Sequence, residues 1–175
     1  HGATVNDVLL ATVSLGLTQY LRERDREVPA ETNFLVPISL KPIDMSLPKE
    51  LGNHFAMVMF PMPLGIEDTD ALLGEVRLRM ARIKNSAEAM MVYGVQRAVA
   101  MTPQTVSENL TRFVANKSVG LLTNVPGPRA PIYLAGHKVE GVLGWVPTSS
   151  DQSIGLCIFS YNGEVNIGIA TDAGI

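Results

Sequence analysis

The sequence has 175 residues, a formal net charge of −3 and a single cysteine. This length suits one domain, or one half of a larger two-part fold, with a substantial hydrophobic core. The acidic balance provides no positive field for nucleic acid, and one cysteine excludes an internal disulfide and favours a reducing, cytosolic compartment. No apolar stretch is long enough for a membrane-spanning helix, and no signal peptide is recognisable. The abrupt N-terminal start predicts that the sequence is an excised part of a longer one.

The first third of the chain predicts one helix followed by two strands. A Thr-x-x-Asp capping-box pattern opens a helix over residues 4–24, which is apolar on nearly all sides and is therefore expected in the interior. Residues 34–40 predict a short strand, which Pro37 places at an edge or a bulge. Residues 53–60 predict a second strand with two apolar faces, so we expect it at the centre of the sheet.

Three helices are expected in the middle of the chain. Residues 68–85 show apolar positions at helical spacing, an acidic first turn and a basic last turn. Residues 88–101 predict a second helix, and Thr102 and Pro103 predict the start of a third, with threonine as N-cap and proline at the first helical position. The apolar side chains of the third helix are expected to point inward: Val106, Leu110, Phe113 and Val114.

Residues 119–128, VGLLTNVPGP, are the stretch around which the chain is organised. They predict a buried strand that runs into a rigid turn, because Pro126 and Pro128 remove backbone donors and fix φ. Gly127 can adopt the positive φ of a tight reversal. Such a turn would place Asn124 reproducibly, although a plain strand-ending turn fits the same residues.

Short strands are predicted for the remainder of the chain. Residues 132–134 and 138–146 read as strands separated by Gly136, and residues 154–171 read as a β-hairpin around Asn162-Gly163. Centring the hairpin on that turn fixes its register. The predicted opposing pairs are Ile158 with Ile167, Leu156 with Ile169, Phe159 with Asn166, and Cys157 with Gly168.

Few residues are candidates for chemistry. The three histidines, His1, His54 and His137, do not have the spacing of metal ligands, so no metal site is expected. Cys157 lies in an apolar strand, which is typical of an inert packing residue rather than a nucleophile. The eight methionines include Met57 and Met59; core filling is the simpler interpretation, and contact with a long alkyl chain is the alternative.

A polar loop precedes the C-terminal hairpin. It contains Ser149 and Ser150, followed by Asp151 and Gln152. From the sequence, this loop could cap a helix, face solvent or line the mouth of a tunnel.

Several stretches, in this order, resemble the bacterial wax ester synthase/acyl-CoA:diacylglycerol acyltransferase family. They are TVNDVLLA at residues 4–11, LGN at 51–53 before a strand ending FPMPL, NVPGP at 124–128, PIYLAG at 131–136 and SYNGEVNIGIATD at 160–172. The resemblance spans nearly the whole chain and covers only the C-terminal half of that family. It therefore implies a C-terminal acyltransferase domain over residues 1–175, without the N-terminal catalytic half.

The resemblance implies both a fold and a reaction. The fold is α/β, with a mixed sheet covered by helices, and forms one half of a chloramphenicol acetyltransferase/condensation-domain-like architecture with a tunnel between its halves. The reaction passes an acyl group from acyl-CoA, a substrate, to a fatty alcohol or diacylglycerol, without a further cofactor. The family's HHxxxDG motif supplies the base, belongs to the N-terminal half and is absent here. No catalytic residue is therefore expected in this chain, and the chain alone should be inactive.

The resemblance also implies roles for individual residues. Asn6 and Asp7 match the family's Asn-Asp motif, for which an architectural role is expected. The structural motif is completed by Asn124, Pro126, Gly127 and Pro128. The residues expected to line the substrate tunnel are Met57, Met59, Ser149 and Ser150.

The implied partners are the N-terminal catalytic half, acyl-CoA and a long-chain alcohol or diacylglycerol. A cytoplasmic location is expected, with peripheral contact to the inner membrane or lipid droplets. Two other functions fit the sequence: half of a carrier-protein-dependent condensation domain, and a non-catalytic lipid-binding module.

Overall fold

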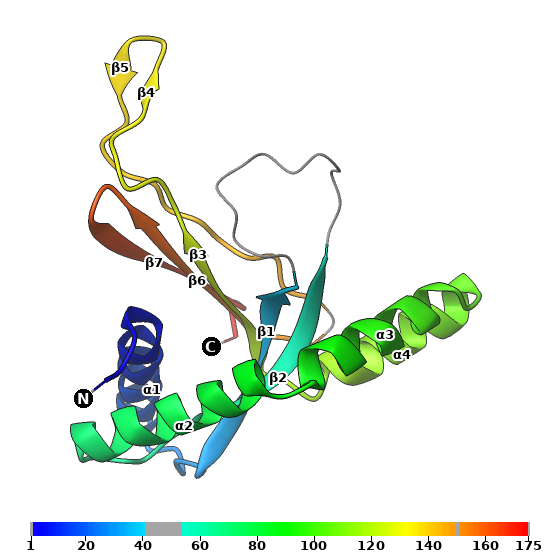
Figure 1. Ribbon diagram of the computed structural model, residues 1–175. Helices are drawn as coiled ribbons and strands as arrows, with labels where there is room; N and C mark the ends of the chain where they lie inside the picture. The colour runs from blue at the N-terminus through cyan, green and yellow to red at the C-terminus, as the bar shows by residue number, and fades with distance from the viewer. Residues whose placement is uncertain (1, 41–53, 150, 175) are drawn as a thin grey trace.

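The computed structural model describes residues 2–40, 54–149 and 151–174 as a mixed α/β fold built on a five-stranded sheet (Figure 1). The strand order is β2-β1-β3-β6-β7. The parallel pairs are β1 with β3 and β3 with β6, and the antiparallel pairs are β1 with β2 and β6 with β7. The strands are β1 (Glu31–Ser39), β2 (Phe55–Pro63), β3 (Gly120–Pro126), β6 (Ile154–Tyr161) and β7 (Glu164–Thr171), and the helices are α1 (Val5–Glu23), α2 (Thr69–Asn85), α3 (Glu88–Ala100) and α4 (Gln104–Ala115). The prediction of a mixed, helix-covered sheet is confirmed.

One face of the sheet is covered by α1 and α2 (Figure 1). The strand register places alternate apolar residues on this face, where they pack against the apolar stripes of the two helices. The core includes Leu10, Val13, Phe34, Val36, Val58, Phe60, Leu72, Val76, Met80, Leu122 and Leu156. Within the described residues, no helix is long and apolar enough to span a bilayer.

Helix α1 is a surface layer rather than an interior helix, so that prediction is wrong. Leu10 and Val13 are buried against the sheet, whereas Val5 is 70% exposed and Val8 is also exposed. The helix needs only one buried stripe because it packs on the sheet from one side.

Strand β2 forms an edge of the sheet, which corrects the prediction of a central strand. It also continues through Pro61 to Pro63, and the first predicted residue, Asn53, lies outside the described residues. The Met57 N–H points away from β1 and donates to Gln96 Oε1 of α3 at 3.3 Å. Backbone N–H groups alternate in direction along a strand. An N–H group at the positions of Pro61 and Pro63 would therefore point away from β1, as that of Met57 does.

Strand β1 lies inside the sheet, although Pro37 predicted an edge or a bulge. Its ladder with β3 contains only Phe34 and Leu35, so Pro37 lies beyond the last of these paired residues. The absence of a backbone N–H at Pro37 therefore breaks no hydrogen bond between β1 and β3.

Helices α3 and α4 form a hairpin that projects beyond the β2 edge (Figure 1). The expectation that the apolar side chains of α4 point inward is wrong: all four are exposed, and Phe113 is 63% exposed. The N-cap of α4 is Pro103 without a side-chain cap, because the Thr102 hydroxyl donates instead to Val99 O at 2.6 Å.

The C-terminal hairpin has the predicted register at all four pairs. In contrast, the two short predicted strands are reduced to β4 (Tyr133–Leu134) and β5 (His137–Lys138), which form a projecting finger (Figure 1). Its turn has positive φ at both Ala135 and Gly136. Residues 139–148 are not a strand but return across the second face of β6 and β7, where Val142 O accepts from Asn166 Nδ2 at 3.2 Å.

Candidate functional site

The Asn-Asp pair lies at the N-terminus of α1. Asp7 Oδ2 accepts from both the backbone N–H and the hydroxyl of Thr4, each at 2.8 Å, while Thr4 Oγ1 accepts from Asp7 N at 3.3 Å. Asp7 is buried, so its carboxylate is held within a complete capping box. The box lies beside a surface hollow of about 200 Å³, which Thr4, Asp7 and Lys84 help to line.

Asn6 joins this helix start to the NVPGP stretch. Its Oδ1 accepts from Asn124 Nδ2 at 2.8 Å, across 118 residues of sequence. Both side chains lie near the surface, at the end of β3 where the chain leaves the sheet. The structure therefore brings together the two motifs, which have no local relationship in the sequence.

The Pro-Gly-Pro turn ends β3, but Gly127 does not adopt the positive φ that the sequence suggested. Glycine is needed here because a Cβ would overlap Ser160 O and the Phe159 ring. Gly127 N donates to Ser160 Oγ at 3.3 Å, and Pro128 O accepts from Asn162 N at 2.9 Å. The turn is thus attached to β6 and to the β6–β7 reversal.

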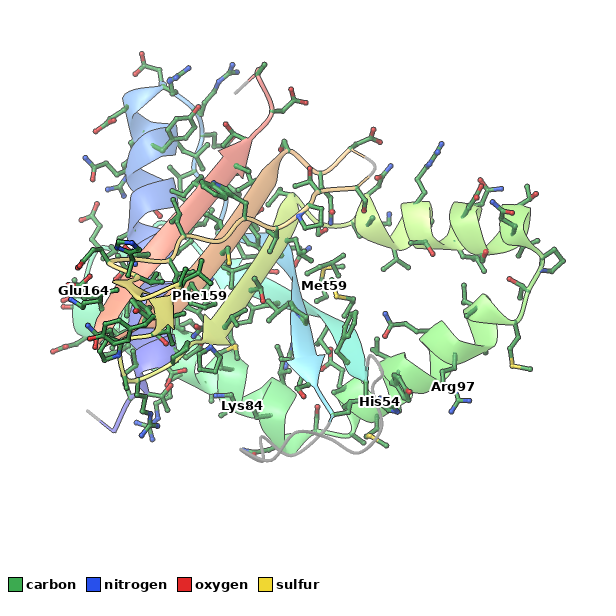
Figure 2. The ribbon with its side chains drawn as sticks, turned by 90° about the horizontal axis from the view of Figure 1, so that it is seen from above. His54, Met59, Lys84, Arg97, Phe159 and Glu164 are labelled. Atoms are coloured by element: carbon green, nitrogen blue, oxygen red, sulfur yellow. The ribbon has the colours of Figure 1, made fainter. Side chains whose placement is uncertain are left out.

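The described residues cover the second face of the sheet only in part. Residues 139–148 cover it over β6 and β7, whereas Met57 and Met59 of β2 remain half-buried. Met59, which is labelled in Figure 2, is paired with Leu35 of β1. This face offers an apolar strip that carries no charged side chain among these residues. Its composition suits an alkyl chain or an apolar protein surface.

Ser149 lies elsewhere, in a surface hollow of about 280 Å³. The other residues that line the hollow are Ser107, Glu108, Thr111 and Arg112, which all have polar or charged side chains. Neither Met57 nor Met59 lines it, so the structure does not bring the predicted tunnel residues into one cavity. Ser150 lies outside the described residues.

The polar loop around Ser149 is tied to the junction between α4 and β3. Gln152 is buried and donates through Nε2 to Ser118 Oγ at 2.7 Å, and Asp151 Oδ2 accepts from Asn116 Nδ2 at 2.6 Å. The sequence suggested three roles for this loop without indicating these contacts, because the partners lie 34 and 35 residues away.

The remaining nucleophile and base candidates are poorly placed for chemistry. His54 is exposed and stacks on Tyr93 with 6.2 Å between ring centroids, and His137 is exposed on the β4–β5 finger; His1 lies outside the described residues. Burial raises the pKa of the Cys157 thiol, which disfavours the reactive thiolate. Over residues 2–40, 54–149 and 151–174, no group of three or more His, Cys, Asp or Glu side chains could hold a metal ion.

We expect Asp7→Ala to lower the free energy of unfolding by roughly 0.5–2 kcal/mol, because the helix loses its capping box. Chemical denaturation measures this loss. In a double-mutant cycle with Thr4→Ala, the double mutant should lose less stability than the two single mutants lose together, because each substitution breaks the same capping box. Unchanged stability together with lost turnover of the full-length protein would contradict an architectural role for Asp7.

Two proteins with related sequences are acyltransferases by name. A wax ester synthase/diacylglycerol acyltransferase 8 of Arabidopsis thaliana is 28% identical over 97% of this chain and 41% of that protein. A Mycobacterium tuberculosis relative with a provisional diacylglycerol O-acyltransferase name is 27% identical, over 96% of this chain and 35% of that protein. This chain thus spans well under half the length of either relative.

A solved structure shows the same fold. The wax ester synthase/diacylglycerol acyltransferase from Marinobacter aquaeolei VT8 superposes with a TM-score of 0.59 and 18% identity, over 97% of this chain and 38% of that chain. The family model described as "WS/DGAT C-terminal domain" matches residues 51–175, which is most of the sequence. The chain therefore belongs to the wax ester synthase/diacylglycerol acyltransferase family, of which it carries the C-terminal domain.

Proposed function

We propose that this chain is the C-terminal part of an enzyme that transfers an acyl group from acyl-CoA to a fatty alcohol or diacylglycerol. The observation that carries the proposal is the family match over residues 51–175. In this reaction the acceptor hydroxyl loses its proton to a base, the alkoxide oxygen attacks the thioester carbonyl, and CoA leaves as its thiol. The chain contributes the apolar wall on which the acyl chain lies, and Met57 and Met59 line that wall.

The catalytic base belongs to a preceding half of the protein. A general base must reach the acceptor hydroxyl within hydrogen-bonding distance in a site that excludes water. His54 and His137 are both exposed, and neither has a hydrogen bond or ion pair to a carboxylate within the described residues. These features support a base supplied by the preceding half, where the family's HHxxxDG motif lies. We propose acyl-CoA as the acyl donor, without a further cofactor.

The exposed surface supports a preceding half that packs against this one. A compact monomer of 18.9 kDa exposes about 8,300 Å², whereas this chain exposes 11608 Å². The excess, roughly 3,000 Å² on this chain alone, leaves room for a large interface, and the projecting α3–α4 hairpin and β4–β5 finger contribute to it (Figure 1). The half-open second face of the sheet is the surface that the proposal assigns to that contact, with the substrate tunnel between the halves. The single, buried Cys157 is compatible with the reducing cytoplasm, which we propose as the location.

The test is ester formation from palmitoyl-CoA and hexadecanol. We expect no product from the purified 175-residue chain, even when circular dichroism shows that it is folded, and product from the full-length protein. His54→Ala and His137→Ala in the full-length protein should each retain most of the turnover, since neither histidine acts as the base. Turnover by the chain alone that is lost on either substitution would contradict the assignment of the base to the preceding half.

A further inference from the structure

The hollow beside the capping box opens between the N-terminal end of α1 and the C-terminal end of α2, and has a volume of about 200 Å³. Its wall on α2 carries two cations, Arg77 and Lys84, together with the side-chain amide of Asn85. Gly2 and Thr4 form part of the opposite wall. Pockets that enclose a whole small molecule measure about 300–1,000 Å³, so this hollow suits one polar or charged group of a larger ligand.

The lining of the hollow carries an excess of positive charge. Asp7 also lines it, but its carboxylate is buried, and Oδ2 accepts from the backbone N–H and the hydroxyl of Thr4 at 2.8 Å each. Lys84 is exposed and has no hydrogen bond or ion pair within the described residues. Arg77 lies against Gly2, where a Cβ would be 3.4 Å from the guanidinium. Two cations beside a single carboxylate that already serves a helix cap favour an anionic ligand.

The topology places this hollow at the carboxyl edge of the parallel strands β1, β3 and β6. Helix α1 ends shortly before β1 begins, so its N-terminal end lies at the opposite, carboxyl edge, where Asn6 accepts from Asn124 at the end of β3. Strand β2 returns antiparallel to β1, and α2 then runs in the direction of β1. It therefore also ends at the carboxyl edge, where Figure 2 labels Lys84. Ligands of open α/β sheets bind outside the carboxyl ends of the parallel strands.

The apolar strip on the second face of the sheet reaches the same edge. Met57 is paired with Pro37 near the carboxyl end of β1, and Phe55 is paired with Ser39, the last residue of that strand. Phe55 is exposed and lies on the same face as Met57, because side chains alternate along a strand. A ligand with an apolar chain on this strip and an anionic group in the hollow would therefore pass over the carboxyl edge. Acyl-CoA has both groups, joined by the flexible pantetheine arm.

We propose that the hollow between α1 and α2 binds a phosphate group in the nucleotide part of acyl-CoA, with Lys84 as the residue that contacts it. The inference rests on the proposed function, because it takes acyl-CoA as the donor. A lysine ammonium binds phosphate as a compact charge with three donors. The phosphates lie far from the thioester, so this contact is equally strong in the ground state and in the transition state. Lys84 should therefore lower KM without raising kcat.

The test compares Lys84→Ala with Arg82→Ala in the full-length protein. Each substitution removes one exposed cation from the last turn of α2, but Arg82 does not line the hollow. With palmitoyl-CoA and hexadecanol, we expect Lys84→Ala to raise the KM for palmitoyl-CoA about five- to tenfold at unchanged kcat. Arg82→Ala should keep the wild-type KM. With S-palmitoyl-pantetheine, which has no phosphate, the wild type and both variants should have the same KM. Calorimetric titration with CoA should show the same loss of affinity without turnover.

Three results would overturn the phosphate site. They are an unchanged KM for palmitoyl-CoA in Lys84→Ala, an equal rise in KM with S-palmitoyl-pantetheine, and an equal rise in Arg82→Ala. Titration with inorganic phosphate separates CoA from other sources of phosphate: if it binds as tightly as CoA, and equally through Lys84, the assignment to CoA is wrong. Failure of the proposed function is distinguishable from these results. If the wild type binds CoA through Lys84 but forms no ester, the function is wrong and the site stands.

Discussion

Leu156→Asp is expected to abolish cooperative unfolding of this domain at ordinary temperatures. Leu156 is 2% exposed on the helix-covered face of the sheet, opposite Ile169 and beside Leu122. A carboxylate at this position would lie among Leu122 and the other apolar core residues, so we expect a loss of roughly 3–5 kcal/mol. This is most of the stability of a domain at the lower end of the usual range of about 5–15 kcal/mol. Thermal melting followed by circular dichroism at 222 nm measures the effect.

Ile169→Asp provides the control for Leu156→Asp. Ile169 is paired directly with Leu156 and lies on the same face, but it is 60% exposed because β7 is an edge strand. A carboxylate there stays in water, so we expect a change below about 1 kcal/mol. Equal destabilisation by the two variants would show that charge on this face is tolerated or rejected regardless of burial, which contradicts the assigned packing.

Gly120→Ala should destabilise the domain by about 3 kcal/mol, the upper end of the range for overpacking. Gly120 begins β3 and is paired with both Phe34 and Ile154. A Cβ there would overlap the Ile154 backbone carbonyl, which belongs to a neighbouring central strand and cannot rotate away as a side chain would. Urea denaturation of the purified variant gives the change in the free energy of unfolding.

Gly94→Ala is the matched control for Gly120→Ala. A Cβ at Gly94 would meet no atom within 4 Å, and the residue lies inside α3. Alanine should therefore stabilise the protein by about 0.5–1 kcal/mol, because it restricts the unfolded chain and favours the helix. If Gly120→Ala were as stable as the wild type, the close approach of β3 to Ile154 would be incorrect.

The parts of the fold that local chemistry determines could be predicted from the sequence. The β6–β7 register follows from the Asn162-Gly163 turn and the alternation on either side of it. The capping box of α1 requires only Thr4 and Asp7, three residues apart. In both places the interacting groups are close in sequence, so their arrangement depends little on the remainder of the protein.

The predictions that failed depended on what covers an apolar surface. Two apolar faces suggested a central β2, but the strand lies at the edge, and α3 approaches it there through Gln96. The spacing of Val106 and Phe113 is that of a helix stripe whether it meets a core or remains uncovered, so periodicity could not reveal their exposure.

The candidate site was predictable only in part, for the same reason. The motifs containing Asn6 and Asn124 could each be recognised, but not their mutual hydrogen bond. The hollow at Ser149 likewise depends on α4, whose apolar side chains the sequence analysis expected to point into the core. Contacts between distant segments require the whole topology, which a pattern of apolar residues does not supply.

The two-residue ladder between β1 and β3 has a consequence for the order of folding. On one side of it, β1 and β2 form nine consecutive pairs, and on the other, β6 and β7 form eight around a tight turn. Each of these units closes a shorter loop than the β1–β3 junction does, so each can form early at low entropic cost. The slow step is then the docking of two preformed β units through the short junction at Phe34 and Leu35, with Gly120 at its centre. A nascent chain still lacking β6 and β7 would accordingly already hold β1, β2 and their helices, while the other half of the sheet waited for those two strands to be synthesised.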